Sequence, residues 1–297
     1  MADQVRQFPH EEDPALFQEA LRYAEATSGF TASLIEKDYY CSLILRQLFR
    51  GETALVFRGG TCLSKVHVGF YRLSEDLDLV IPASVDATRS ERRDLASPVR
   101  SAFDCLCDEI PGLEISEPMK GHNESRQYIG DVRYRSAVLQ RHESLKIEVS
   151  LREDLLRPVR HADASTLALD PFTETPLLAP FTVGAMTIKE AFAEKYRAAV
   201  SRREPAIRDF FDLLHAVRSK LLNPDDAEFL EMVREKLQVK GNAPLMLSPD
   251  RVRLLEQQTE GRLRPVLRPR DFAEFSLEDA CDLVRRIESS CRLHPSP

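Results

Sequence analysis

The chain has 297 residues, of which 43% are hydrophobic and 30% charged, and its formal net charge at pH 7 is -7. At about 150 residues per domain, this length predicts one large domain or two closely associated ones with a substantial core. The hydrophobic fraction is too high and the net charge too small for a wholly disordered chain. No apolar run approaches the roughly 20 residues of a membrane span, and no signal peptide is visible. We therefore expect a cytoplasmic protein without a membrane partner.

The first 110 residues predict several helices and two strands. Asp13 and Pro14 are typical of the N-cap and the first position of a helix, and Gly51 is typical of a residue that ends one. Hydrophobic periodicity predicts helices over residues 14–28, 31–50 and 88–109, a short helix from Thr61, and strands over residues 53–58 and 77–81.

The rest of the chain divides into a strand-rich part and a helical part. Residues alternate in polarity over 132–138 and 145–151, as in half-buried strands, and four prolines indicate an ordered linker or crossing segment over about 157–184. Helix starts are predicted by a capping box at Thr187–Glu190, by Pro205 at a first helical position, and by residues 276–279. We expect a mixed α/β (α+β) core over residues 1–185 and a helical domain over residues 186–297.

A glycine pair follows the first predicted strand. Gly59 and Gly60 are the only adjacent glycines in the chain, and they lie between that strand and the helix start near Thr61. Without a Cβ, such a turn allows backbone N–H groups at a helix N-terminus to approach a phosphate. Taken alone, however, a glycine pair is more often an ordinary strand-to-helix turn.

Two acidic residues on the next predicted strand change this interpretation. Asp76 and Asp78 are two positions apart, so their carboxylates project from one face while Leu77 and Leu79 point into the core. Neighbouring carboxylates repel each other unless a cation lies between them, and Mg²⁺ prefers such oxygen ligands. An acidic pair on the surface is the alternative. The position of the pair, about fifteen residues after the glycine turn, favours a metal and phosphate site.

A third carboxylate is expected on a neighbouring strand. In residues 145–151 the apolar positions alternate with Lys146, Glu148 and Ser150, which share the opposite face. Glu148 is therefore an acid within an otherwise apolar strand. A glutamate that faces solvent gives the same pattern, but the acidic pair upstream favours a role for Glu148 at the metal site.

The order of these features resembles the nucleotidyltransferase superfamily with a polymerase-β-like core, and more closely its AbiEii/AbiGii (MenT-type) toxin family. The resemblance rests on five stretches: EKDY (36–39), FRGGTCLSK (57–65), RLSEDLD (72–78), AFAEKYRA (191–198) and RDFFDL (208–213). They lie within about residues 31–220. One departure is Leu73, where the family often has an aromatic residue, which is a change in packing.

The resemblance implies a small mixed sheet with flanking helices, and an enzyme that transfers a nucleoside monophosphate from an NTP to a hydroxyl acceptor. It implies two Mg²⁺ ions held by Asp76, Asp78 and Glu148. The residues implied to bind the nucleotide are Gly59, Gly60, Thr61, Ser64, Lys65, Arg72 and Arg208. Because such a protein mainly positions and neutralises phosphates, activity should depend on these few groups.

Two further residues are placed in the active site by the resemblance alone. These are Lys195 and Asp209, through which the helical domain would contribute to the active-site cleft. From the residues themselves, the lysine could instead pair with Glu190 or Glu194 on a helix surface. Asp209 and Asp212 could complement a helix dipole, and Asp212 has less support than Asp209 as a site residue.

The acceptor implied by the resemblance is the 3′ end of tRNA, whose modification would block translation, and an antitoxin would be encoded nearby.

The net charge argues against a broadly basic face but allows a local basic groove. Candidate RNA-binding residues near the implied site are Lys189, Arg197, Arg202 and Arg203. A second cationic set comprises Arg251, Arg253, Arg262, Arg264, Arg268 and Arg270. Solvated helix faces with interleaved glutamates are the alternative for both sets.

The sequence also suggests a regulatory site and two alternative functions. Ser74 is a candidate phosphosite, because a phosphate two residues before Asp76 would add negative charge beside the carboxylates. One alternative function is a nucleotidyltransferase that modifies a protein or a small molecule. Another is an NTP-binding module without turnover, against which the complete set of three carboxylates argues.

Overall fold

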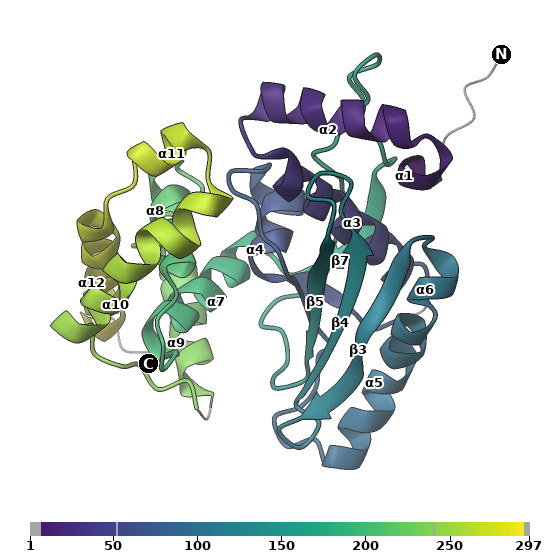
Figure 1. Ribbon diagram of the computed structural model, residues 1–297. Helices are drawn as coiled ribbons and strands as arrows, with labels where there is room; N and C mark the ends of the chain where they lie inside the picture. The colour runs from purple at the N-terminus through teal and green to yellow at the C-terminus, as the bar shows by residue number, and fades with distance from the viewer. Residues whose placement is uncertain (1–6, 52, 240, 294–297) are drawn as a thin grey trace. The chain divides into compact units, whose positions relative to one another are not determined.

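The computed structural model describes residues 7–51, 53–239 and 241–293. The chain divides into two compact units: unit 1 comprises Met1–Leu155 and Val159–Met186, and unit 2 comprises Leu156–Pro158 and Thr187–Pro297. Unit 1 contains a sheet with helices packed against it, and the described part of unit 2 is helical (Figure 1). None of the described helices is long and apolar enough to cross a membrane.

Unit 1 is built on one seven-stranded sheet with the strand order β3-β4-β5-β2-β1-β7-β6. Its strands are β1 (Val56–Arg58), β2 (Leu77–Val80), β3 (Leu113–His122), β4 (Gln127–Arg135), β5 (His142–Ser150), β6 (Arg160–Ala164) and β7 (Phe181–Ala185). Strand β2 is antiparallel to β1 and parallel to β5, and β1 is parallel to β7. The sheet is therefore mixed, which confirms the predicted mixed α/β fold.

Several helices of unit 1 begin or end at the predicted signals. They are α1 (Pro9–Glu12), α2 (Pro14–Ser28), α3 (Ala32–Leu48), α4 (Gly59–Cys62), the π-helix η1 (Leu63–Val68), α5 (Arg89–Asp104) and α6 (Leu106–Glu109). Asp13 caps α2 as predicted, because its side chain accepts a hydrogen bond from the backbone of Leu16. The predicted helix over 88–109 is interrupted at Cys105, which separates α5 from α6.

The core of unit 1 lies on one side of the central strands. On β5 the side chains of Leu145, Ile147 and Val149 are fully buried, whereas Lys146 and Glu148 are only partly buried on the opposite face. Helix α3 supplies a long row of buried residues to the same core. The central strands therefore keep one face for the core and leave polar side chains on the other.

Three strands of unit 1 were not predicted from the sequence. The proposed linker over 157–184 contains β6 and β7, which pair with each other, and β7 also pairs with β1 through Phe57 and Ala185. The prolines of this segment lie outside both strands, and a proline cannot donate a ladder hydrogen bond. Strand β3 contains Pro118, which coincides with a shift in its pairing to β4 between Glu117 and Lys120. Pro158 and Pro180 thus lie just before β6 and β7, and Pro118 lies at the shift in β3. The prediction of a linker without strands is wrong.

Unit 2 confirms the predicted helical character of the C-terminal region. Its helices are α7 (Ile188–Ser201), α8 (Ile207–Arg218), α9 (Ala227–Gln238), α10 (Pro249–Gln258), the π-helix η2 (Thr259–Leu263), the 3-10 helix η3 (Arg264–Val266), α11 (Pro269–Ala273) and α12 (Leu277–Leu293). Pro205 precedes the N-cap residue Ala206, so its predicted place inside helix α8 is wrong.

The predicted capping box at the start of α7 is also wrong. Thr187 is the N-cap residue, but its side chain makes no capping hydrogen bond. The Glu190 carboxylate instead accepts hydrogen bonds from the backbone N–H groups of Leu156 and Arg157, at 2.9 and 3.1 Å. It also lies 2.9 Å from the buried ammonium of Lys236. A buried carboxylate requires such partners, and here tertiary contacts provide them.

Candidate functional site

The glycine pair makes two close packing contacts at the end of β1. Gly59 has a positive φ of 77°, and a Cβ added to it would lie 2.4 Å from Oδ2 of Asp78. A Cβ on Gly60 would lie 2.2 Å from Nη2 of Arg72. No side chain fits at such distances, so the turn can pack on the Asp78 carboxylate and the Arg72 guanidinium only because both residues are glycines. The structure thus brings together four of the predicted site residues.

Replacing Gly59 with alanine tests this contact. We expect a loss of about 1–2 kcal/mol of unfolding free energy from the left-handed backbone, and displacement of Asp78 with at least about a hundredfold loss of activity. Gly69 offers a matched control, because it has the same φ of 77° but nothing within 4 Å of an added Cβ. Chemical denaturation and turnover of both variants separate the two effects. Equal losses of activity in G59A and G69A would contradict the proposed role of the contact.

The acidic pair has the predicted orientation. Asp76 immediately precedes β2 and Asp78 lies within it, while Leu77 and Leu79 are fully buried. The hydroxyl of Thr61 donates a hydrogen bond of 2.5 Å to the backbone carbonyl of Asp76. The helix that follows the glycine turn is therefore tied directly to the start of the acidic strand.

Strand register brings charged residues to both sides of Asp78. Arg58 on β1 and Glu148 on β5 are its direct partners across the sheet. Nζ of Lys146 lies 3.2 Å from Oε2 of Glu148. Burial alone would raise the pKa of Glu148, but the charges of Lys146 and Arg58 outweigh burial, and the net pKa is lowered. Glu148 is therefore a carboxylate at neutral pH, next to Asp78 as predicted.

The carboxylates suit a magnesium ion in their chemistry. Within the described ranges, no group of three or more His, Cys, Asp or Glu side chains is arranged to hold a metal ion. The metal set of Asp76, Asp78 and Glu148 therefore stays a prediction, and in this structure the Glu148 carboxylate is paired with Lys146. Mg²⁺ commonly uses one or two carboxylates together with substrate phosphates. The pair of aspartates beside a glycine turn fits that pattern, and a bound nucleotide would complete it.

Ser64 and Lys65 lie behind the turn and are buried. The Ser64 hydroxyl contacts the backbone carbonyls of Gly60 and Arg72, at 3.1 and 2.7 Å. Nζ of Lys65 donates to Oδ1 of Asp38 at 2.5 Å and to the Ser42 hydroxyl at 2.6 Å. The predicted phosphate contacts of these two side chains do not fit this placement, because their polar atoms face protein partners inside the core.

Two other predicted residues lie near the turn. Arg72 is 1% exposed, and its Nη1 donates a hydrogen bond to the backbone carbonyl of Leu73. Its guanidinium packs against Gly60 and so supports the glycine turn from inside the protein. Ser74 is half-buried in the segment that leads to Asp76. The structure therefore favours a positioning role for Arg72 over the predicted contact with the nucleotide.

A second charged cluster lies within unit 2. Nζ of Lys195 on α7 is 2.9 Å from Oδ1 of Asp209 and 2.9 Å from Oδ2 of Asp212, both on α8. Both aspartates are buried, and Arg202 approaches Asp209 to 3.2 Å. Burial would raise the pKa of Asp209, but the charges of Lys195 and Arg202 lower it overall. The lysine thus pairs with the aspartates of the next helix, and not with Glu190 as the surface alternative requires.

The predicted RNA-binding residues differ in their ion pairing and in their exposure. Lys189 forms ion pairs with Asp226 and Glu228, and Arg197 pairs with Glu194 at 2.6 Å. Arg202 and Arg203 are exposed, and Arg208 is half-buried. The structure therefore leaves the loop after α7 as the most accessible part of this predicted surface.

The second arginine set proves to be largely ion-paired. Arg251 is buried and donates from Nη1 to the backbone carbonyls of Arg202 and Arg203, at 2.9 and 3.1 Å. The ion pairs of the others are Arg253 with Asp250, Arg262 with Glu204, Arg264 with Glu260, and Arg268 and Arg270 with Asp271. These contacts favour the alternative of helix faces with interleaved acids for this set.

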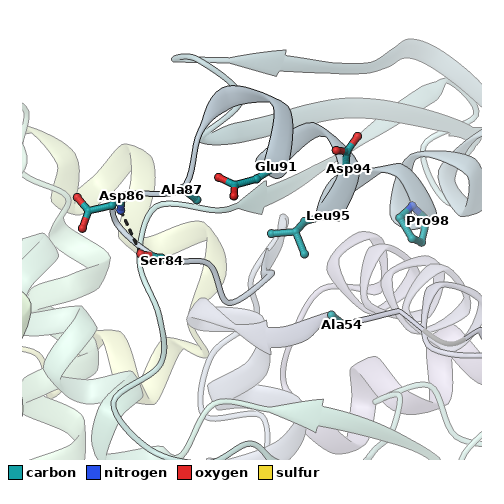
Figure 2. A pocket seen from close by; sticks show the side chains of 8 residues that line it. All are labelled: Ala54, Ser84, Asp86, Ala87, Glu91, Asp94, Leu95 and Pro98. Atoms are coloured by element: carbon teal, nitrogen blue, oxygen red, sulfur yellow. Dashed lines mark hydrogen bonds between the residues drawn. The ribbon is translucent and has the colours of Figure 1, made fainter.

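A separate pocket of about 720 Å³ lies in unit 1 beside α5 (Figure 2). It is lined by Ala54, Ser84, Asp86, Ala87, Glu91, Asp94, Leu95 and Pro98. Figure 2 shows carboxylates of three acidic residues around its apolar lining. None of the lining residues is a predicted site residue, and an acidic rim repels phosphates. The pocket is therefore distinct from the candidate site.

A strand, a glycine turn and a helix, followed in a mixed sheet by a strand with an acidic pair, form the arrangement that the motifs predicted for a nucleotidyltransferase. The sequence profile of the family "Nucleotidyl transferase AbiEii toxin, Type IV TA system" matches residues 43–280. The chain belongs to this family, and the resemblance stated from the motifs is confirmed. Its members are nucleotidyltransferase toxins of type IV toxin–antitoxin systems.

Two crystal structures from Helicobacter pylori are similar to this chain. The structure of JHP933 has 18% sequence identity and a TM-score of 0.49, with 89% of this chain and 94% of that chain covered. Another H. pylori structure has 18% identity and a TM-score of 0.49, covering 88% of this chain and 97% of its own. No protein of curated function matches the sequence.

Proposed function

We propose that this protein is a toxin that transfers a nucleoside monophosphate from an NTP to the 3′ end of tRNA, with Mg²⁺, and thereby blocks translation. A neighbouring antitoxin would counteract it. The observation that carries the transfer chemistry is the position of Asp78, whose carboxylate packs on Gly59 and is the direct strand partner of Glu148. Family membership supports the type of reaction, and the RNA acceptor follows from the resemblance of the motifs.

Five residues of unit 1 have a defined part in this proposal. Asp76 and Asp78 would hold two magnesium ions, with Glu148 as a further ligand. Bound Mg²⁺ neutralises the triphosphate and favours deprotonation of the attacking hydroxyl. The glycine turn lets Asp78 and Arg72 approach the start of the helix that follows it, because no Cβ lies in their way. Lys195 and Asp209 are included in the proposal through the family motif.

Labelled nucleotides test the proposal directly. The protein is incubated with total RNA, Mg²⁺ and each of the four labelled NTPs in turn, and the products are separated by size. We expect label in a band of tRNA size, and none with the D76A variant. Label only in protein bands would support the alternative protein acceptor. Nucleotide binding without any transfer would instead indicate a binding module without turnover.

RNA binding by the loop after α7 gives a second expected result. Reversing the charge of Arg203 (R203E) should weaken tRNA binding and reduce the slope of log affinity against log salt by about 1. The double variant R202E/R203E should weaken binding further, although Arg202 also neutralises Asp209. R253E is the control, because Arg253 is an exposed arginine on α10. Unchanged affinity of R203E at low salt would remove the loop from the proposed RNA surface.

A further inference from the structure

Lys146 is the cation nearest to Glu148 among the described contacts of that carboxylate. The two residues are two positions apart on β5 and therefore share the polar face of the sheet. Their charged atoms are 3.2 Å apart, and the side chain of Lys146 is 40% exposed while that of Glu148 is 19% exposed. The charges of Asp76 and Asp78 also attract Lys146. The ammonium group of Lys146 thus pairs with Glu148 and lies in the electric field of the two aspartates.

The positive charges around Asp78 and Glu148 reduce the repulsion between these two carboxylates. Asp78 and Glu148 are direct partners on adjacent strands, and like charges in such positions are destabilising. A positive charge from Lys146 and another from Arg58, the partner of Asp78 on β1, reduce this repulsion. A lysine ammonium sits on a flexible stem and is strongly hydrated, so a partly exposed one can move into solvent at low cost.

We propose that Lys146 is an exchangeable counter-ion that competes with divalent metal ions for the carboxylates of this site. A divalent ion that binds without nucleotide must take the Glu148 carboxylate from Lys146 and then remain close to its ammonium group. Both requirements weaken metal binding. A triphosphate adds negative charge that offsets them, so the metal would enter together with the nucleotide. This inference rests on the proposed function, because it concerns the same carboxylates.

The test is a titration of the intact protein with Mn²⁺ alone, followed by electron paramagnetic resonance of the unbound ion. K146Q removes the charge and keeps a polar side chain of similar length. We expect K146Q to bind Mn²⁺ about tenfold more tightly than the wild type, because one nearby positive charge is lost. K146R keeps the charge and should bind within about twofold of the wild type.

K120Q is the matched control for a general change in charge. Lys120 lies on β3 of the same sheet, with a side chain that is 65% exposed and paired with Glu117. Its replacement should leave the Mn²⁺ affinity unchanged. K146T, with a β-branched residue that suits a strand, repeats the test if K146Q shows no cooperative thermal unfolding.

The outcomes separate this inference from the proposed function. If D78N loses Mn²⁺ binding while K146Q binds as the wild type does, or more weakly, Lys146 is not a competing counter-ion and the metal site stands. If K120Q gains as much Mn²⁺ affinity over the wild type as K146Q does, the inference is also overturned, since any loss of a lysine charge would then have this effect. If D78N binds Mn²⁺ as the wild type does, the metal site of the proposed function fails as well.

Discussion

Replacing Asp78 with asparagine should lower the kcat/KM of nucleotidyl transfer at least about a thousandfold, which corresponds to about 4 kcal/mol of transition-state stabilisation. Asparagine has nearly the same size, so it still fits against Gly59, where the added Cβ would lie only 2.4 Å from the carboxylate. The substitution removes the negative charge while the packing is kept. The expected loss therefore reports on charge, and single-turnover kinetics with labelled NTP measure it.

The control for D78N is D163N. Asp163 is also a strand aspartate of unit 1, and its Oδ1 accepts a hydrogen bond of 3.0 Å from the Thr182 hydroxyl on the neighbouring strand. Its replacement changes the same charge elsewhere in the sheet and should leave kcat/KM within about twofold, as expected for a surface position. A D78N protein that unfolds normally and retains more than about a tenth of the activity would refute the central role of Asp78.

Replacing Lys195 with methionine should lower the unfolding free energy by about 3 kcal/mol, because a buried ion pair that loses one partner leaves an uncompensated charge. The side chains of Asp209 and Asp212 are only 4% and 0% exposed, and each lies 2.9 Å from Nζ of Lys195. Arg202 lies 3.2 Å from Asp209 and remains in the variant, so the expected loss is smaller than for a carboxylate pair that keeps no cation. Urea denaturation followed by circular dichroism measures it.

Lys189 provides a control for K195M on the same helix. It also contacts two acids, Asp226 and Glu228, but its side chain is 33% exposed and those acids are more exposed still. Because solvent screens such pairs, K189M should cost less than about 1 kcal/mol. The double variant K195M/D212N should recover part of the loss, since it removes one of the two buried negative charges that Lys195 neutralises. Equal costs for K189M and K195M would contradict the account based on burial.

Local patterns were sufficient to predict the acidic strand. The alternation of Asp76 and Asp78 with buried leucines depends only on the two-residue period of a strand, and the structure has that arrangement. The same period predicted the polar face of β5 with Glu148. Signals that act within four or five residues therefore predicted about half of the elements, and the family motifs predicted the type of enzyme.

Lys65 shows why the same reasoning fails for buried polar groups. Its place after the glycine turn suggested a phosphate ligand, but its partner Asp38 lies 27 positions upstream on α3. Nothing in the local sequence encodes that contact, because it depends on how α3 packs behind the turn. The capping box at Thr187 failed for a similar reason, since Glu190 is used by distant backbone groups.

The sequence by itself determined the composition of this site: two aspartates on one strand, a glutamate on another, and a glycine turn without side chains. Only the tertiary structure decided that Asp78 lies against Gly59, that Arg58 and Glu148 are its strand partners, and that Lys146 holds Glu148. The reason is physical. Periodicity assigns a residue to a face, whereas strand register and core packing decide which residues of different elements meet on that face.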